Sequence, residues 1–140
     1  MFKTVVVAMD GSRGSADALP VAHELAKREG GSLVLVHVVE KIAAKGGATI
    51  RADEDEVRAD LERKVEELSA EGVDASLQVV GITLGGPAHA IADIADEAGA
   101  DLIVAGTRGH TQLGGLLLGS TTNRLLHVAK CPVLAVPPAA

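Results

Sequence analysis

Residues Asp101–Thr122 read DLIVAGTRGHTQLGGLLLGSTT, and the fold can be worked out from this stretch. The apolar run from Leu102 to Ala105 ends in Gly106, and two further glycines follow at Gly109 and Gly119. The pattern predicts a strand, a glycine-rich loop and a helix that begins at Ser120. Glycines at a strand end allow positive φ and a close approach of the backbone to a ligand, and the first N–H groups of a helix lack intrahelical acceptors. The stretch therefore predicts a phosphate-binding loop.

Composition limits the classes of protein to consider. A chain of 140 residues fits one domain, and Phe2 is its only aromatic residue. The formal net charge of -6 and the lack of Trp and Tyr argue against a nucleic-acid partner, which needs basic and stacking side chains. The single cysteine, Cys131, excludes an intramolecular disulfide. The N-terminal apolar run is far shorter than the ~20 residues that span a bilayer, so we expect a cytoplasmic protein with no membrane contact.

Apolar runs alternate with amphipathic segments along the whole chain. Four helices are predicted at about 15–28, 54–71, 87–98 and 120–129, and five strands at 4–9, 32–39, 75–80, 102–105 and 133–136. Residues 40–53 are small and polar without a clear period, which predicts a surface loop. Residues 75–80 alternate apolar and polar side chains, which is typical of a strand at a sheet edge.

Strands that alternate with helices favour an α/β fold, a doubly wound five-stranded parallel sheet with helices on both faces. With the third strand at one edge and the fifth at the other, the simplest strand order is 3-2-1-4-5. The winding then reverses between the first and fourth strands, and ligands of such sheets bind outside the carboxyl ends of the strands at that point. Asp10 and Gly106 both follow these strand ends.

Several nucleotide motifs are absent. Gly114–Thr121 has the frame of the phosphate loop G-x-x-x-x-G-K-S/T, but Ser120 stands where the lysine is needed. No G-x-G-x-x-G follows a predicted strand, and neither H-x-G-H nor S-G-G-x-D-S of adenylyl-transfer proteins occurs. The pattern that remains is G-x2-G-x9-G-S/T, formed by Gly106, Gly109, Gly119 and Ser120.

This pattern resembles the ATP-binding branch of the universal stress protein family. The similarity extends over the chain, through the opening VVVAMDGS, the second strand ending VHVV, the GGP helix start and the closing CPVLAV. The resemblance implies one Rossmann-like domain over residues 1–140, similar to the adenine nucleotide alpha hydrolases. It also implies a role as a nucleotide-dependent regulator of the stress response.

The resemblance assigns nucleotide contacts by position. Asp10, with Ala8 beside it, would hold the ribose or adenine side, and Val38 would offer backbone groups to adenine. The loop and the helix start would contact the phosphates, and Mg²⁺ or Mn²⁺ would be bound through the phosphates. The residues of this loop and helix start are Gly106, Arg108, Gly109, Gly119, Ser120, Thr121 and Thr122.

No catalytic residue is predicted, because phosphoryl transfer needs a lysine, an arginine finger or an oriented carboxylate that the loop does not clearly offer. We therefore expect little or slow ATP hydrolysis. Three alternatives stay open: a dimeric scaffold that binds no nucleotide, a slow ATPase, and a protein that prefers AMP or cyclic AMP.

The remaining features of the sequence are interpreted as parts of the structure or of a subunit contact, and not as parts of a catalytic or metal site. The apolar edge strand Val133–Val136 is a candidate homodimer contact. The five histidines lack metal-ligand spacing and are interpreted as solvated or structural, and Cys131 as a packed residue. The acidic run Asp53–Glu56 is interpreted as a solvated cap of the following helix.

Overall fold

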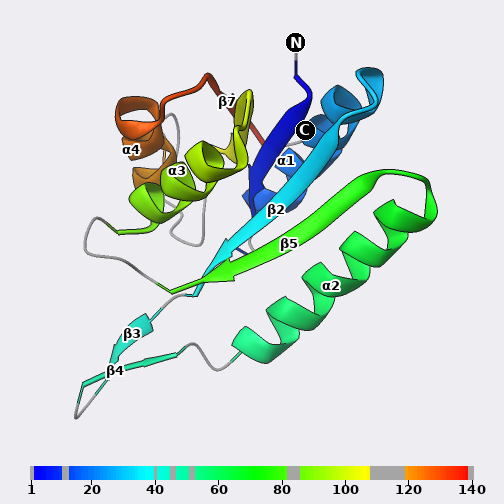
Figure 1. Ribbon diagram of the computed structural model, residues 1–140. Helices are drawn as coiled ribbons and strands as arrows, with labels where there is room; N and C mark the ends of the chain where they lie inside the picture. The colour runs from blue at the N-terminus through cyan, green and yellow to red at the C-terminus, as the bar shows by residue number, and fades with distance from the viewer. Residues whose placement is uncertain are drawn as a thin grey trace.

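The structure is a computed structural model that describes residues 2–10, 13–39, 41–44, 47–50, 53–81, 86–107 and 119–138. Its helices are α1 (Arg13–Arg28), α2 (Glu54–Ala70), α3 (Pro87–Ala98) and α4 (Ser120–Val128). Its strands are β1 (Thr4–Ala8), β2 (Ser32–Val38), β3 (Lys41–Ala44), β4 (Gly47–Ile50), β5 (Asp74–Val80), β6 (Leu102–Gly106) and β7 (Val133–Val136). Figure 1 shows the helices packed around one twisted sheet, with β3 and β4 as a separate hairpin.

The main sheet has five parallel strands in the order β5-β2-β1-β6-β7. Because β5, β6 and β7 are the third, fourth and fifth predicted strands, this is the predicted order 3-2-1-4-5, and the prediction is confirmed. The unbroken apolar runs lie in the centre, where Val5, Val6 and Val7 of β1 are fully buried. A strand with helices on both faces needs apolar side chains in both directions, which explains these runs.

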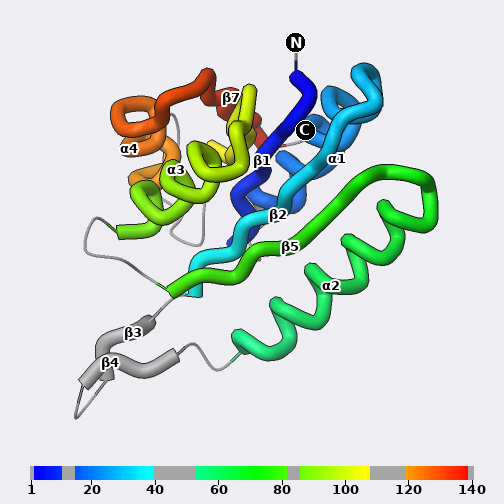
Figure 2. The backbone as a smooth tube through the Cα atoms, in the orientation of Figure 1, coloured from blue at the N-terminus to red at the C-terminus, as the bar shows by residue number. Residues whose placement is uncertain are grey.

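The four helices form two layers, one on each face of the sheet (Figures 1 and 2). Helices α1 and α2 cover one core cluster, which includes Val5, Leu35 and Leu61. Helices α3 and α4 cover a second cluster that includes Val6 and Ile103. Successive residues of β1 thus enter opposite layers, as the pleat of a strand requires.

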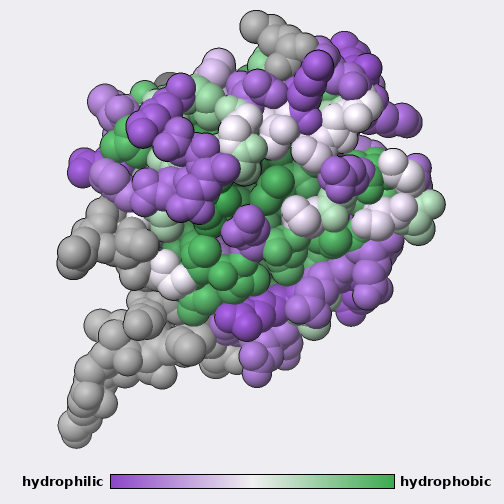
Figure 3. All heavy atoms as spheres, in the orientation of Figure 1, coloured by the Kyte–Doolittle hydropathy of each residue, from purple (hydrophilic) through white to green (hydrophobic). Residues whose placement is uncertain are grey.

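The edge strand β5 differs from the central strands, as its alternating sequence predicted. Its residues Asp74, Ser76 and Gln78 are exposed, and the residues between them are half-buried. Figure 3 shows hydrophobic side chains gathered in the middle of the face, and mainly hydrophilic ones along the lower right, where Figure 1 shows α2. Only one face of β5 is therefore well covered, because α2 packs against it.

The segment 40–53, predicted as a surface loop, contains a two-stranded antiparallel hairpin. Strand β3 pairs with β4 from Lys41 opposite Ile50 to Ala44 opposite Gly47. The prediction missed this hairpin because its strands are four residues long and rich in Ala and Gly, which give no clear period. The hairpin forms a separate sheet from the five-stranded one.

Candidate functional site

The winding of the chain reverses between the two central strands. From β1 the chain enters α1, which packs on the first core cluster, and from β6 it leads to α4, whose Leu125 lies in the second. Strands β1 and β6 are paired in parallel, with Val7 opposite Val104. Their carboxyl ends therefore form the switch point that sequence analysis predicted, and open α/β sheets bind ligands at such a point.

The beginning of α4 is bonded to the end of β6. The Gly119 N–H donates to the Thr107 carbonyl over 2.7 Å, and the Thr122 hydroxyl donates to the Gly106 carbonyl over 2.6 Å. Thr122 is buried, whereas Ser120 is exposed and Thr121 is half-buried. These bonds hold the N-terminus of α4, with the positive end of its dipole, beside the switch point.

The Thr122 hydroxyl was predicted to contact phosphate. In the structure it donates its hydrogen bond to the Gly106 carbonyl instead. Its oxygen remains a possible acceptor only, so Ser120 and Thr121 are the better hydroxyl donors for an anion in this turn. Backbone N–H groups of the first helical turn are further donors.

The predicted contacts on the adenosine side lie at the ends of the neighbouring strands. Ala8 ends β1, and Asp10 follows it two residues later and is half-buried. Val38 ends β2 and is buried. The structure thus brings Ala8, Asp10, Val38, Gly106 and the start of α4 to the same edge of the sheet.

The direction of the Val38 backbone follows from the hydrogen bonds around it. The Met9 N–H donates to the Val36 carbonyl over 2.8 Å, and the Val39 N–H donates to the Val80 carbonyl over 2.8 Å. Since successive residues of a strand direct their backbone groups to alternate neighbours, Val38 directs its own toward the β1 side, like Val36. Because β1 ends at Ala8, these groups face the region just beyond that strand.

One of the two expected reasons for a glycine at the end of β6 is not borne out. Gly119 has φ of −59°, and among the described residues positive φ occurs only at Gly30, Gly72, Gly86 and Gly99. Gly106, at the strand end, therefore does not adopt the positive φ that a glycine allows there, and the close approach of its backbone to a ligand stays a prediction. Arg108 and Gly109, also predicted contacts, lie outside the described residues.

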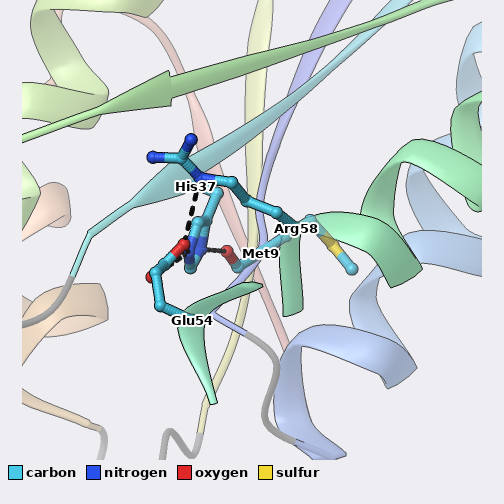
Figure 4. A network of polar contacts seen from close by, with 4 residues as sticks. All are labelled: Met9, His37, Glu54 and Arg58. Carbon is cyan, nitrogen blue, oxygen red and sulfur yellow. Dashed lines mark hydrogen bonds and ion pairs between the residues drawn. The ribbon is translucent and has the colours of Figure 1, made fainter. Parts of the chain in front are cut away.

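A buried polar network lies beside this edge and was not predicted (Figure 4). His37 Nδ1 lies 2.8 Å from the Met9 carbonyl oxygen, and Nε2 lies 2.9 and 3.0 Å from the two carboxylate oxygens of Glu54. The Arg58 guanidinium donates through Nε to Glu54 over 3.3 Å. His37 is 2% exposed and Glu54 is 6% exposed, so the interpretation of Glu54 as a solvated cap is wrong.

Only a weak signal for this network is present in the sequence. His37 is the one polar residue in the otherwise apolar run 33–39, and Glu54 lies 17 residues further along. A buried polar side chain in a central strand needs a partner, and that requirement could have marked His37 as a structural histidine.

A second group of polar residues lies at the C-terminal end of α3. Here Lys130 and Asp96 form an ion pair of 3.2 Å beside Cys131, which lines a small pocket with Gly99 and Ala100. Burial raises the pKa of the Cys131 thiol, and the nearby carboxylates of Asp101 and Asp96 raise it further. A thiol held neutral is a poor nucleophile and a poor metal ligand.

Neither a cluster suited to a metal ion nor a membrane-spanning helix occurs in the parts of the chain that the structure describes. There, no three His, Cys, Asp or Glu side chains cluster closely enough to hold a metal ion. None of the described helices combines the length and apolar character needed to cross a bilayer.

Comparison with known proteins identifies the family. The sequence profile of the Universal stress protein family matches residues 1–137. The chain belongs to this family. A universal stress protein of Thermus aquaticus is 36% identical to it, with 97% of this chain and 99% of the relative covered.

Two solved structures of the family contain adenine nucleotides. A universal stress protein in complex with cAMP shares 27% identity and a TM-score of 0.70, with 99% of this chain and 98% of that one covered. The universal stress protein of Archaeoglobus fulgidus in complex with dAMP shares 25% identity and a TM-score of 0.66, with 97% and 98% covered. The fold of this chain is thus shared with family members that bind nucleotides.

Proposed function

We propose that this universal stress protein binds ATP at the switch point between β1 and β6 and acts as a nucleotide-dependent regulator of the stress response. The observation that carries the proposal is the bonded turn between β6 and α4, in which Gly119 and Thr122 hold a helix N-terminus beside the strand ends. Such a turn suits the phosphates, because its amides are donors and its dipole favours an anion.

The other end of the nucleotide would lie across the ends of β1 and β2. The Asp10 carboxylate suits the ribose hydroxyls, and the backbone of Val38 suits the polar edge of adenine. Since the chain has no Trp or Tyr, the base would pack against aliphatic side chains such as Ala8. Recognition would then depend on backbone hydrogen bonds rather than on aromatic stacking.

A metal ion would be bound mainly by the nucleotide. Within the described residues, the lack of a cluster of potential ligands does not fit a metal site formed by protein groups alone. Mg²⁺ or Mn²⁺ coordinated by the phosphates would supply positive charge to the phosphate tail. We propose that hydrolysis is slow, and phosphate release faster than about one per minute would contradict this, since a median enzyme turns over ~10 times per second.

Calorimetric titration of the purified protein with ATP and Mg²⁺ tests the proposal. Gly119→Val should abolish binding because its side chain would occupy the space of the phosphates, while the extended φ of −59° allows the substitution in the backbone. Gly81→Ala is the matched control, because a Cβ there meets nothing within 4 Å and its site lies beyond the end of β5, two strands from β1. Equal ATP affinity of Gly119→Val and wild type would refute this placement of the phosphates.

A second candidate ligand is a nucleoside monophosphate. The complexes of the two relatives with cAMP and dAMP favour it. Competition of AMP and cyclic AMP against ATP decides between them, because contacts of the γ-phosphate at the start of α4 should make ATP the tighter ligand. Because the chain lacks Trp and Tyr, copurified nucleotide would also dominate the ultraviolet absorbance near 260 nm.

We further propose a homodimer through Val133–Val136. Strand β7 is an edge strand of the sheet, and its Leu134 side chain is 38% exposed. An apolar edge strand tends to pair with another chain unless it is covered. Leu134→Lys should shift the protein from dimer to monomer in sedimentation velocity, and a wild-type monomer at micromolar concentration would contradict the proposal.

A further inference from the structure

The ends of β1 and β2 carry the proposed contacts to adenosine. Two of these contacts, Asp10 and Val38, each follow directly after a residue of the buried network, Met9 and His37. The network therefore lies one residue away from both contacts, on strands that are neighbours in the sheet. A side chain that fixes Met9 relative to His37 also fixes the spacing of the two contacts.

His37 donates to the Met9 carbonyl oxygen, which is the acceptor that the next hydrogen bond between β1 and β2 would use. The Met9 N–H donates to the Val36 carbonyl, and the next hydrogen bond of a parallel ladder would join the Val38 N–H to the Met9 carbonyl. That carbonyl oxygen accepts a 2.8 Å bond from His37 Nδ1. The histidine side chain thus joins the two strands where their regular pairing stops and allows the Val38 N–H to serve a ligand.

The donor and acceptor types show where the protons of this network lie. A carbonyl oxygen can only accept, so His37 Nδ1 must carry a proton. At Nε2 a second proton must lie between the ring and the Glu54 carboxylate, because otherwise a nitrogen lone pair would face two carboxylate oxygens at 2.9 and 3.0 Å. Arg58, whose side chain is 46% exposed, adds positive charge on the outer side of Glu54.

Glu54 connects the network to a third segment. It is the first residue of α2, and it is buried although the residues after it, Asp55 and Glu56, are exposed. The negative charge at this helix start is favoured by the helix dipole. The His37 ring is therefore held between the end of β1 and the start of α2 (Figure 4).

We propose that His37 and Glu54 are positioning residues of the nucleotide site, which hold Asp10 and Val38 at the spacing that adenosine requires. The inference rests on the proposed function. Neither side chain touches the nucleotide; both act by ordering the ends of two strands before the ligand arrives. Loss of this order should weaken ATP binding roughly tenfold, since a ligand must then immobilise the strand ends itself.

The decisive variant is the double substitution His37→Leu with Glu54→Leu. This double substitution removes the buried ionisable pair as a whole, so no buried charge loses its partner, although the Met9 carbonyl loses its donor and some stability is lost with it. A purely structural pair thus predicts normal ATP affinity in a folded double variant. A positioning pair predicts roughly tenfold weaker ATP binding in the double variant under conditions where urea unfolding shows that it is folded.

Two further variants make the test independent of the folding of the double variant. In Glu54→Gln the amide can donate to Nε2 while Nδ1 still donates to Met9, so ATP affinity should stay within about threefold of wild type. Glu54→Ala removes this partner and should weaken ATP binding roughly tenfold. In wild type, nitrogen-15 shifts of the imidazole should show a proton on Nδ1.

Asp101→Ala is the matched control for a general loosening of β1. Asp101 accepts bonds from the Lys3 and Thr4 N–H groups over 2.9 and 3.0 Å, at the opposite end of that strand. This variant should be less stable than wild type but bind ATP within about twofold. Wild-type ATP affinity in Glu54→Ala or in the folded double variant would overturn the inference alone, whereas a wild-type chain that binds no adenine nucleotide would overturn the proposed function as well.

Discussion

The hydroxyl of Thr122 offers a sensitive test of how α4 is attached to the sheet. It is buried, with 4% of its surface exposed, and it donates a 2.6 Å hydrogen bond to the carbonyl of Gly106. Thr122→Val keeps the shape of the side chain and removes only the donor. We expect the variant to fold, with the end of β6 less firmly joined to the start of α4.

The expected loss of free energy of unfolding follows from the burial of this hydrogen bond. A hydrogen bond contributes about 0.5–1.5 kcal/mol net, and an acceptor left unpaired in a buried place costs about 1–3 kcal/mol. We therefore expect Thr122→Val to lower the free energy of unfolding by roughly 1–2 kcal/mol. With about 2.1 cal/mol/K of unfolding entropy per residue, a chain of 140 residues should lose roughly 3–7 °C in Tm.

The assay is urea and thermal unfolding followed by circular dichroism at 222 nm, since the chain has no Trp or Tyr for fluorescence. Thr122→Ser is the control, because it keeps the donor and loses one methyl group, worth about 0.8 kcal/mol. If the hydroxyl holds the turn, Thr122→Val should also weaken ATP binding, and Thr122→Ser should not. A valine variant as stable as wild type would refute the reasoning.

Two further predictions concern the opposite end of the sheet. A Cβ at Gly31 would lie 2.2 Å from the Lys3 carbonyl oxygen, so Gly31→Ala should lower the free energy of unfolding by roughly 1–3 kcal/mol, and the same stability as Gly81→Ala would contradict the close contact. Because burial and two carboxylates raise the pKa of the Cys131 thiol, iodoacetamide at pH 8 should alkylate the folded protein more slowly than the urea-unfolded chain. Because the thiol has a higher pKa in the folded state than in the unfolded state, its contribution to stability is complete below the unfolded pKa and is lost as pH rises through the folded pKa. The urea midpoint of Cys131→Ala should therefore fall less between pH 7 and 9.5 than that of wild type.

The order of the sheet could be predicted from the sequence because burial on two faces and burial on one face leave different patterns. The unbroken apolar run of β1 marks a central strand, and the alternation in β5 marks an edge. Helix starts were also predictable where backbone chemistry is restrictive, as at Pro87. These signals are local, and each lies within a few residues.

The parts that were missed depend on contacts between distant residues. Nothing local distinguishes Glu54 from Asp55 and Glu56 beside it, yet Glu54 alone of these three is buried against His37. The backbone conformation of Gly106 was also not predictable, because a glycine that adopts positive φ and one that does not look alike in a sequence. Only the assembled fold separates these cases.

The position of β1 in the centre of the sheet has a consequence for the protein during its synthesis. Thr4 and Asp101 meet across the start of the β1–β6 pair although they are 97 residues apart in the chain. A ribosome that adds about 5–20 residues per second needs roughly 5–20 s to make that stretch. For this time β1, an apolar strand that becomes central in the finished sheet, has one unpaired edge, so the nascent chain is exposed to aggregation and is a natural client for chaperones until β6 emerges.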